Sequence, residues 1–276
     1  MNNTLPRAQW RVIHHPPFTG ARNMAVDEAI LEAVQQEKSP PTLRLYDWVP
    51  ACLSLGIAQS LTDVDADALR AHGWEMVRRP TGGRAILHID ELTYSVIGPP
   101  NESRLAGGVL ESYHRLSQGL MRAMEILALP VQRQNGKSSN GADMNPICFE
   151  APSDNEITLD GKKLVGSAQA RRKGGVLQHG SLPLYGDIGR ITQVLVYASE
   201  NERAAAAERV RARAASVEAG LGRRVEWAEA AEAFVQGFGE ALNIEFIAGE
   251  LTAEEEEAAE RWTEERYGAS RWTERV

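Results

Sequence analysis

Residues 78–88 read RRPTGGRAILH: two arginines run into a Pro-Thr-Gly-Gly turn, and a strand-like segment then ends on a histidine. Gly82 and Gly83 carry no side chain, so a ligand can approach their backbone N–H groups closely. Arg78, Arg79 and Arg84 would surround that turn with positive charge. The alternative is a tight hairpin with solvated arginines, and this stretch alone does not separate the two interpretations.

Composition indicates an ordinary globular protein, because 43% of the 276 residues are hydrophobic and 25% are charged. Such a chain builds one large domain with a small appendage, or two modest domains. The net charge of −8 argues against nucleic-acid binding as the main function. No apolar run is long enough to cross a bilayer, and residues 1–12 lack a signal-peptide core. We therefore expect a cytoplasmic protein without a membrane partner, and we take a monomer as the default state.

Helices are predicted at both ends of the chain and strands between them. Asn23–Glu37 has helical apolar spacing with Asn23 as the N-cap, and Leu110–Leu129 returns to that spacing. Short alternating runs predict five strands between these helices: Thr42–Tyr46, Cys52–Ile57, Glu75–Arg79, Arg84–His88 and Leu92–Ile97. Three helices follow in the C-terminal third: Glu200–Ala215, Trp227–Leu242 and one that opens with the capping box Thr252-x-x-Glu255. The order predicts an α+β fold, a mixed or antiparallel sheet flanked by helices.

A β-hairpin is predicted at residues 156–165, because Asp160-Gly161 suits a type I′ turn. Leu159 then pairs with Lys162, and Thr158 pairs with Lys163. Alternation places Lys163 on the face opposite the apolar one, so Lys163 is the lysine that we expect to face a site. The alternative is a solvated surface charge. Residues 176–184 predict a further pair of strands.

Cys148 is the sharpest candidate for chemistry. The chain has two cysteines, too few for a disulfide framework, and Cys52 has the surroundings of a packed strand residue. Cys148 follows the polar segment Asn135–Pro146, which predicts a loop and an accessible thiol. A thiol becomes a nucleophile at neutral pH when a nearby cation favours the thiolate, and Lys163 is the candidate cation. The alternative is a small buried hydrophobe.

Other catalytic arrangements find less support. His88, His179 and Cys148 match no zinc-ligand spacing, so we expect no metal, and a structural role is favoured for each histidine. No G-x-S-x-G elbow is present, which argues against a serine hydrolase. The small residues Gly166, Ser167 and Ala168 form a segment that can lie against a ligand.

Several motifs in order resemble the biotin/lipoate protein ligase superfamily. They are RRPTGGRAILH at 78–88, ELTYS at 91–95, KLVGSA at 163–168, HGSL at 179–182 and the opening NMAVDE at 23–28. The resemblance runs from about Asn23 to Leu242. It implies a catalytic domain of that type over residues 23–247, preceded by an N-terminal segment (1–22) and followed by a C-terminal helical cap (248–276).

Within that superfamily, Cys148 lies 15 residues before Lys163, which resembles the octanoyltransferases of the Gram-positive-type lipoate pathway. The resemblance implies that Cys148 carries the acyl group, that Lys163 lowers the pKa of its thiol, and that no cofactor is needed. It implies an octanoyl-acyl carrier protein as donor and a lipoyl domain as acceptor, with the glycine-cleavage H protein expected. The substrate-binding residues that it implies are Arg79, Gly82, Gly83, His88, Gly166, Ser167, Ala168, His179 and Gly180.

Three alternatives stay open: an ATP-dependent lipoate or octanoate ligase, an octanoyl amidotransferase between lipoyl domains, and a carrier-binding module without catalysis. The chain departs from the superfamily pattern twice. Arg84 replaces a third glycine, which disfavours a nucleotide phosphate path, and Ile89 replaces the aspartate that often follows the histidine. Because carrier proteins are acidic, we expect docking on the basic residues Arg171, Arg172 and Lys173.

Overall fold

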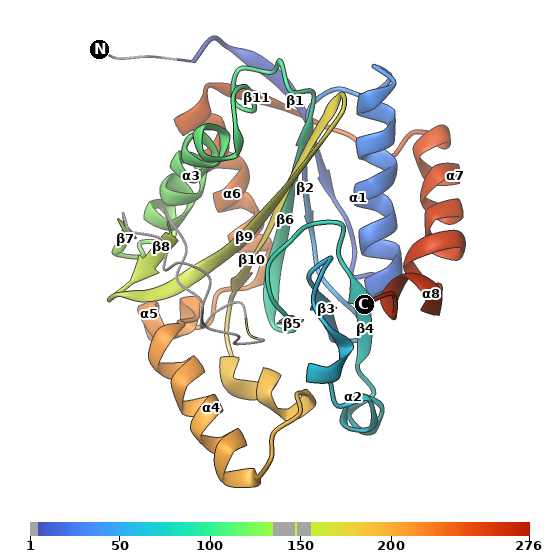
Figure 1. Ribbon diagram of the computed structural model, residues 1–276. Helices are drawn as coiled ribbons and strands as arrows, with labels where there is room; N and C mark the ends of the chain where they lie inside the picture. Colours follow the sequence, from blue (N-terminus) through green and yellow to red (C-terminus); the bar gives the residue numbers. More distant parts are fainter. Residues whose placement is uncertain (1–4, 135–146, 148–155) are drawn as a thin grey trace.

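A mixed eight-stranded sheet forms the centre of the molecule in the computed structural model, which describes residues 5–134, 147 and 156–276 (Figure 1). Its strand order is β11-β1-β2-β6-β10-β9-β8-β7. The strands are β1 (Ala8–His14), β2 (Thr42–Tyr46), β6 (Glu91–Gly98), β7 (Val131–Gln134), β8 (Glu156–Leu159), β9 (Lys162–Arg172), β10 (Gly175–Pro183) and β11 (Ile244–Ala248). The pairs β11–β1 and β1–β2 are parallel, and every pair from β2 to β7 is antiparallel. The predicted fold class is confirmed.

A separate three-stranded sheet carries the Arg-Arg-Pro-Thr-Gly-Gly motif. In it β3 (Cys52–Leu55) lies between β4 (Glu75–Arg78), which is parallel to it, and β5 (Ile86–His88), which is antiparallel. The turn at 79–85 joins β4 to β5. One face of this small sheet packs on an apolar cluster that includes Leu53, Ile191 and Val210.

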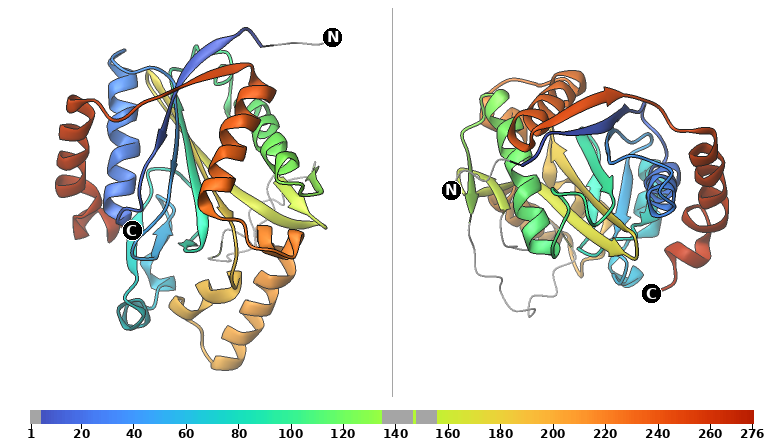
Figure 2. Two further views of the ribbon diagram at one scale, coloured as in Figure 1. Left: turned by 180° about the vertical axis from the view of Figure 1, so that it is seen from behind. Right: turned by 90° about the horizontal axis from the view of Figure 1, so that it is seen from above.

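Helices cover both faces of the large sheet (Figure 2). On one face, α3 (Val109–Ile126) and α6 (Trp227–Leu242) pack against each other and against the largest apolar cluster. On the other face, α1 (Gly20–Gln35) packs on Ile97 and Leu177, with α7 (Ala253–Trp262) outside it. Burial of these apolar stripes is the main stabilising term of the fold.

The shorter helices lie around this frame. They are α2 (Ala66–His72), α4 (Glu200–Arg213), α5 (Val217–Leu221), α8 (Ser270–Thr273), two 3₁₀ helices (Leu61–Asp63 and Ile188–Val194) and a π-helical turn (Thr263–Tyr267). None of the helices in the described part of the chain has the length and apolar character that a membrane span requires.

Two sequence predictions need correction. Helix α1 begins at Gly20, because the Thr19 hydroxyl accepts a hydrogen bond from the backbone of Arg22 and is the N-cap. Asn23, the predicted cap, is buried, and its amide donates to the carbonyls of Phe18 and Asp47. Residues 176–184 form no pair of strands, because a single strand, β10, runs between β6 and β9.

The predicted hairpin is confirmed. Leu159 pairs with Lys162 and Thr158 with Lys163, and Asp160 and Gly161 have φ of 49° and 75°, as a type I′ turn requires. The register shifts by one residue between Thr158 and Ile157, so Ile157 pairs with Val165. The alternation expected along this strand is therefore interrupted, and Leu164 and Val165 both enter the main core.

Candidate active site

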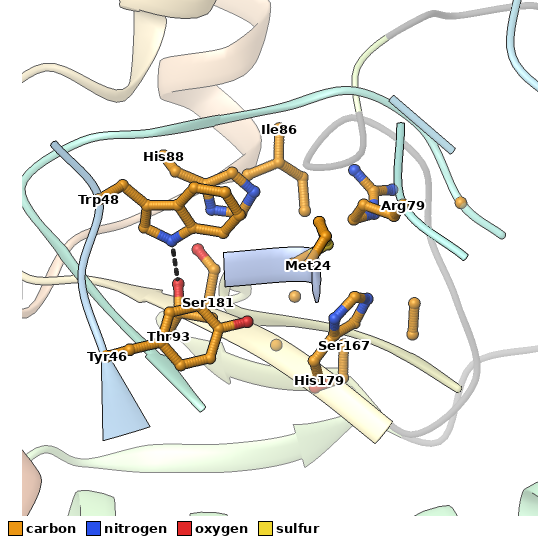
Figure 3. Close-up of a pocket in the computed structure, with 14 residues that line it drawn as sticks. Met24, Tyr46, Trp48, Arg79, Ile86, His88, Thr93, Ser167, His179 and Ser181 are labelled. Carbon is orange, nitrogen blue, oxygen red and sulfur yellow. Dashed lines mark hydrogen bonds between the residues drawn. The ribbon is translucent and has the colours of Figure 1, made fainter. Parts of the chain in front are cut away.

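A pocket opens between the two sheets, beside the N-terminal half of α1 (Figure 3). Its empty volume is about 410 Å³, which includes open solvent. Helix α1 contributes Met24, and the small sheet and its turn contribute Arg79, Gly83, Ile86 and His88. The large sheet and the segment after β2 contribute Tyr46, Trp48, Thr93, Gly166, Ser167, Ala168, His179, Gly180 and Ser181.

Eight of the nine substrate-binding residues expected from the sequence line this pocket. They are Arg79, Gly83, His88, Gly166, Ser167, Ala168, His179 and Gly180. Gly82 is not among the lining residues, and a Cβ placed on it would meet no atom within 4 Å. Residues from three sequence motifs, at 78–88, 163–168 and 179–182, therefore meet at one cavity.

Two of the three motif arginines, Arg78 and Arg79, are not solvated. Arg79 is 3% exposed and donates from Nη1 to the carbonyl and hydroxyl of Ser54, and from Nη2 to the carbonyls of Gly82 and Arg84. It thus holds the glycine turn closed from within. Arg78 is fully buried and donates to the carbonyls of Thr273, Gly56 and Gln59. For these two arginines the interpretation as solvated hairpin residues is wrong.

His88 is held by both ring nitrogens. Nε2 lies 2.6 Å from Ser54 Oγ, and Nδ1 lies 2.7 Å from Glu91 Oε1. Because Arg79 donates to Ser54 Oγ, the serine hydrogen is free to point at Nε2, and Nδ1 then carries the proton donated to Glu91. The ring also stacks on Trp48, with centroids 4.0 Å apart. His88 is therefore a fixed wall of the pocket.

Ser54, His88 and Glu91 have the hydrogen-bond geometry of a Ser-His-acid triad, yet Ser54 does not work as a nucleophile here. Its side chain is fully buried in β3 and is absent from the pocket lining. Sequence reasoning missed Ser54 and Glu91. The signal for Glu91 was its place three residues after His88, from which its carboxylate reaches Nδ1 of the ring.

A second buried network supports His179. Its Nε2 lies 2.7 Å from Thr81 Oγ1, and its Nδ1 lies 3.7 Å from Asp27 Oδ2. Burial lowers the pKa of His179, and Asp27 offsets only part of that effect. Burial would raise the pKa of Asp27, but the ion pair with Arg44 and the contact with His179 outweigh it and hold the pKa below its usual value. Asp27 is ionised and His179 is neutral at neutral pH.

Gly180 allows strands β9 and β10 to approach closely at the pocket floor. A Cβ on Gly180 would lie 2.5 Å from the carbonyl oxygen of Gly166 and 2.6 Å from Tyr94 Cε1. The neighbouring Ser167 hydroxyl lies 2.8 Å from the Tyr94 hydroxyl. The small residues therefore serve packing as well as access to the cavity.

Cys148, the predicted nucleophile, lies outside the described residues. Ile147, which precedes it, is buried in the cluster under the small sheet and forms a parallel bridge with Ala85, just before β5. Lys163 is 6% exposed on β9, three residues before the pocket-lining Gly166, and its carbonyl accepts a hydrogen bond from Ala215. The loop predicted over residues 135–146 also lies outside the described residues.

The predicted docking residues differ in their surroundings. Arg171 donates to the carbonyls of Leu105 and Gly107, and Arg172 pairs with Glu28. Lys173 is exposed. Within the described residues, no cluster of three or more His, Cys, Asp or Glu side chains has the arrangement of a metal site.

A family model, the lipoyl protein ligase A/B catalytic domain, matches residues 19–239. The chain belongs to this family. The match includes every element that lines the pocket, from α1 to β10.

Curated relatives of this lipoyl protein ligase A/B family member are octanoyltransferases. The chain is 41% identical to octanoyltransferase LipM of Carboxydothermus hydrogenoformans, with 90% of this chain and 92% of the relative covered. It is 42% identical to octanoyltransferase LipM of Kyrpidia tusciae, with 91% and 94% covered. For the enzyme of the same name from Clostridioides difficile the identity is 37%, with 88% and 91% covered.

Solved structures share the fold at lower identity. A bipartite lipoate protein ligase from Thermoplasma acidophilum superposes with a TM-score of 0.82 at 24% identity, covering 97% of both chains. A lipoate-protein ligase A bound with ATP gives 0.77 at 24% identity, covering 98% of this chain and 99% of the other. At these identities the likeness establishes the fold alone.

Proposed function

We propose that this protein is an octanoyltransferase of lipoate biosynthesis, which moves an octanoyl group from a carrier-protein thioester to a lysine of a lipoyl domain. The observation that carries the proposal is the similarity to octanoyltransferases, at 37–42% identity over about nine tenths of the chain. The pocket supports it, because the surface that lines it is mainly apolar and suits a hydrocarbon chain.

In the first half of the proposed reaction, the Cys148 thiolate attacks the carbonyl carbon of the donor thioester. A new C–S bond forms to Cys148, the original C–S bond breaks, and the carrier thiolate leaves and takes up a proton. One thioester replaces another, so this step is nearly balanced in energy and reversible.

In the second half, the ε-amine of the acceptor lysine attacks the Cys148 thioester. A C–N bond forms, the C–S bond to Cys148 breaks, and the proton lost by the amine balances the charge on the released thiolate. Amide formation from a thioester is downhill, so the proposed reaction uses no ATP and no cofactor.

Lys163 is proposed to favour the Cys148 thiolate as a cation and to give its proton to the leaving carrier thiolate. As the neutral amine it then accepts the proton from the incoming lysine. Its burial supports this role, because a charge with little access to water acts strongly on a near neighbour. The bridge between Ile147 and Ala85 also supports the proposal, since it fixes the residue before Cys148 beside the pocket strand β5. The backbone N–H groups of Gly82 and Gly83 are proposed to stabilise the developing oxyanion.

Intact-mass spectrometry after incubation with octanoyl-acyl carrier protein tests the proposal. We expect wild type to gain one octanoyl group, Cys148→Ala to gain none, and Cys52→Ala to behave as wild type. Addition of a lipoyl-domain protein should then discharge the adduct without ATP. An unloaded wild-type protein that acylates the lipoyl domain only with ATP would identify a ligase instead.

The identities of the donor and acceptor form a finer part of the proposal. Octanoyl-acyl carrier protein is the proposed donor and the glycine-cleavage H protein the proposed acceptor. Loading from octanoyl-acyl carrier protein, compared with loading from an octanoylated H protein, separates this assignment from an amidotransferase. Loading only from octanoylated H protein would identify the protein as an amidotransferase.

A further inference from the structure

One end of the pocket is formed by side chains that look polar in the sequence. We call it the inner end and define it by Tyr46, Trp48, His88, Thr93 and Ser181, which lie together on one side of the cavity (Figure 3).

Each hydrogen-bond donor of this inner end is paired with a buried protein group. The Trp48 indole N–H donates to Thr93 Oγ1 at 2.7 Å, and the Thr93 hydroxyl donates in turn to Glu91. The Ser181 hydroxyl donates to the other Glu91 oxygen at 2.6 Å. The Glu91 carboxylate therefore accepts hydrogen bonds from two pocket hydroxyls.

Glu91 also accepts a hydrogen bond from Nδ1–H of His88, and the Ser54 hydroxyl is hydrogen-bonded to Nε2. The imidazole therefore presents only its carbon atoms to the cavity. The Tyr46 hydroxyl donates to Asp27 at 3.0 Å. Within the described lining of the inner end, every side-chain N–H and O–H donor thus has a protein acceptor.

A ligand group that reaches this end and carries a hydrogen-bond acceptor would lose its water without gaining a donor. Such a loss is costly in a buried site, whereas a methyl or methylene group loses nothing. The chemistry of the inner end therefore favours a plain hydrocarbon tail over a tail with an ether or carbonyl oxygen.

We propose that Glu91 and Asp27 determine the specificity of the pocket for an unsubstituted aliphatic acyl tail, by holding the donors of the inner end away from the ligand. That the tail belongs to an acyl group rests on the proposed function. The two residues are positioning residues, because each acts through a pocket side chain.

The test compares octanoate with 7-oxaoctanoate, an isosteric acid in which an ether oxygen replaces the seventh carbon. Calorimetry gives the ratio of the two dissociation constants without any transfer step. For wild type we expect 7-oxaoctanoate to bind at least tenfold more weakly. Equal binding of the two acids would overturn the proposal.

Thr93→Ala removes the acceptor of the Trp48 N–H and leaves room for a ligand oxygen, so we expect the ratio to fall several-fold. Thr93→Ser has the same loss of the methyl group but keeps the hydroxyl, and should retain the wild-type ratio. A Thr93→Ala ratio equal to that of Thr93→Ser would overturn the proposal. Glu91→Gln, in which an amide replaces an acceptor-only carboxylate, should lower the ratio as well.

The same pair of acids separates this inference from the proposed function. If octanoate binds with the expected selectivity but octanoyl-acyl carrier protein loads no thiol, the transferase proposal fails and the specificity proposal stands. If the thiol is loaded at equal rates from octanoyl and 7-oxaoctanoyl carrier protein, and the free acids bind equally, the specificity proposal fails and the transferase proposal stands.

Discussion

Ile147 forms a parallel β-bridge with Ala85, directly before the strand whose Ile86 and His88 line the pocket. The Ile147 side chain is 1% exposed and packs in the cluster under the small sheet. The backbone before Cys148 is thus tied to the same strand that forms the pocket wall. This bridge joins a residue far along the chain to the glycine-rich motif.

The two cysteines should differ sharply in reactivity. Burial raises the pKa of the Cys52 thiol well above its ordinary value, and the side chain is fully buried. At pH 8 this thiol is therefore protonated and inaccessible. If Cys148 is the nucleophile, iodoacetamide should modify one thiol per native chain and two after unfolding, with Cys148 identified by peptide mass.

Lys163→Met tests the origin of that reactivity. Loss of the cation should raise the pH at which the native thiol reacts with iodoacetamide, whereas Lys162→Met should not, because Lys162 Nζ donates to the carbonyl of Arg211 at the surface. An unchanged pH profile for Lys163→Met would remove Lys163 from the proposed dyad.

Two glycines of the motifs should differ in their tolerance of alanine. Gly180→Ala should destabilise the protein by about 1–3 kcal/mol, because the added Cβ would overlap the Gly166 carbonyl oxygen and the Tyr94 ring. Gly82→Ala is the matched control, since a Cβ there meets no atom within 4 Å. Urea unfolding measures both. A Gly82→Ala protein less stable than Gly180→Ala would contradict this account.

The sequence predicted the elements with local signals. The I′ hairpin at Asp160-Gly161, the capping box at Thr252 and the alternating strands β2 to β6 are where their patterns indicate. Strands β1 and β11 were not predicted. They pair in parallel across more than 230 residues, and such pairing leaves no local mark in either strand.

The pocket lining was predicted through motifs, and its supporting residues were not. Arg79, His88 and His179 belong to recognisable motifs, so they were found. Ser54 reaches His88 through the pairing of β3 with β5, and only tertiary structure reveals that contact, whereas Glu91 lies three residues after His88 in the sequence. The same pairing explains why Arg79, read as solvated in one interpretation, is buried.

Stability should fall as the pH drops through the range where His15 titrates. Burial lowers the pKa of His15 to about 3, and Arg44, which donates to its Nδ1, adds to the effect. The unfolded chain binds a proton near pH 6.5, so the stability is fully present above that pH and is lost as the pH falls towards 3. His15→Asn keeps an acceptor for Arg44 without titrating, and should lose less stability.

Urea midpoints at pH 8 and pH 5 measure this difference. Because His15 is partly exposed, we expect the variant to reduce the loss by less than the ~1.4 kcal/mol per pH unit of a fully buried site. The same loss in variant and wild type would show that other groups carry the acid sensitivity.

Carrier docking on residues 171–173 is best tested at Lys173. Charge reversal of Arg172 would place a second carboxylate beside Glu28. A loss of transfer in that variant could then come from weaker docking or from lower stability. Lys173 is exposed, and Lys173→Glu should raise the KM for octanoyl-acyl carrier protein and weaken its salt dependence without changing the Tm. An unchanged salt dependence would exclude Lys173 from docking.

The hydrogen-bond polarity around His88 predicts one tautomer. Arg79 donates to Ser54 Oγ at 2.6 Å, so the serine hydrogen is available for Nε2, and the proton of the ring lies on Nδ1, facing Glu91. Long-range ¹H–¹⁵N spectra at pH 8 should therefore show His88 as the Nδ1–H form. Ser54→Ala removes the donor to Nε2 and should shift the Nε2 resonance. Ser181→Ala removes a Glu91 contact that does not involve the ring, and should leave the tautomer unchanged. An Nε2–H signal in wild type would reverse the polarity of the network.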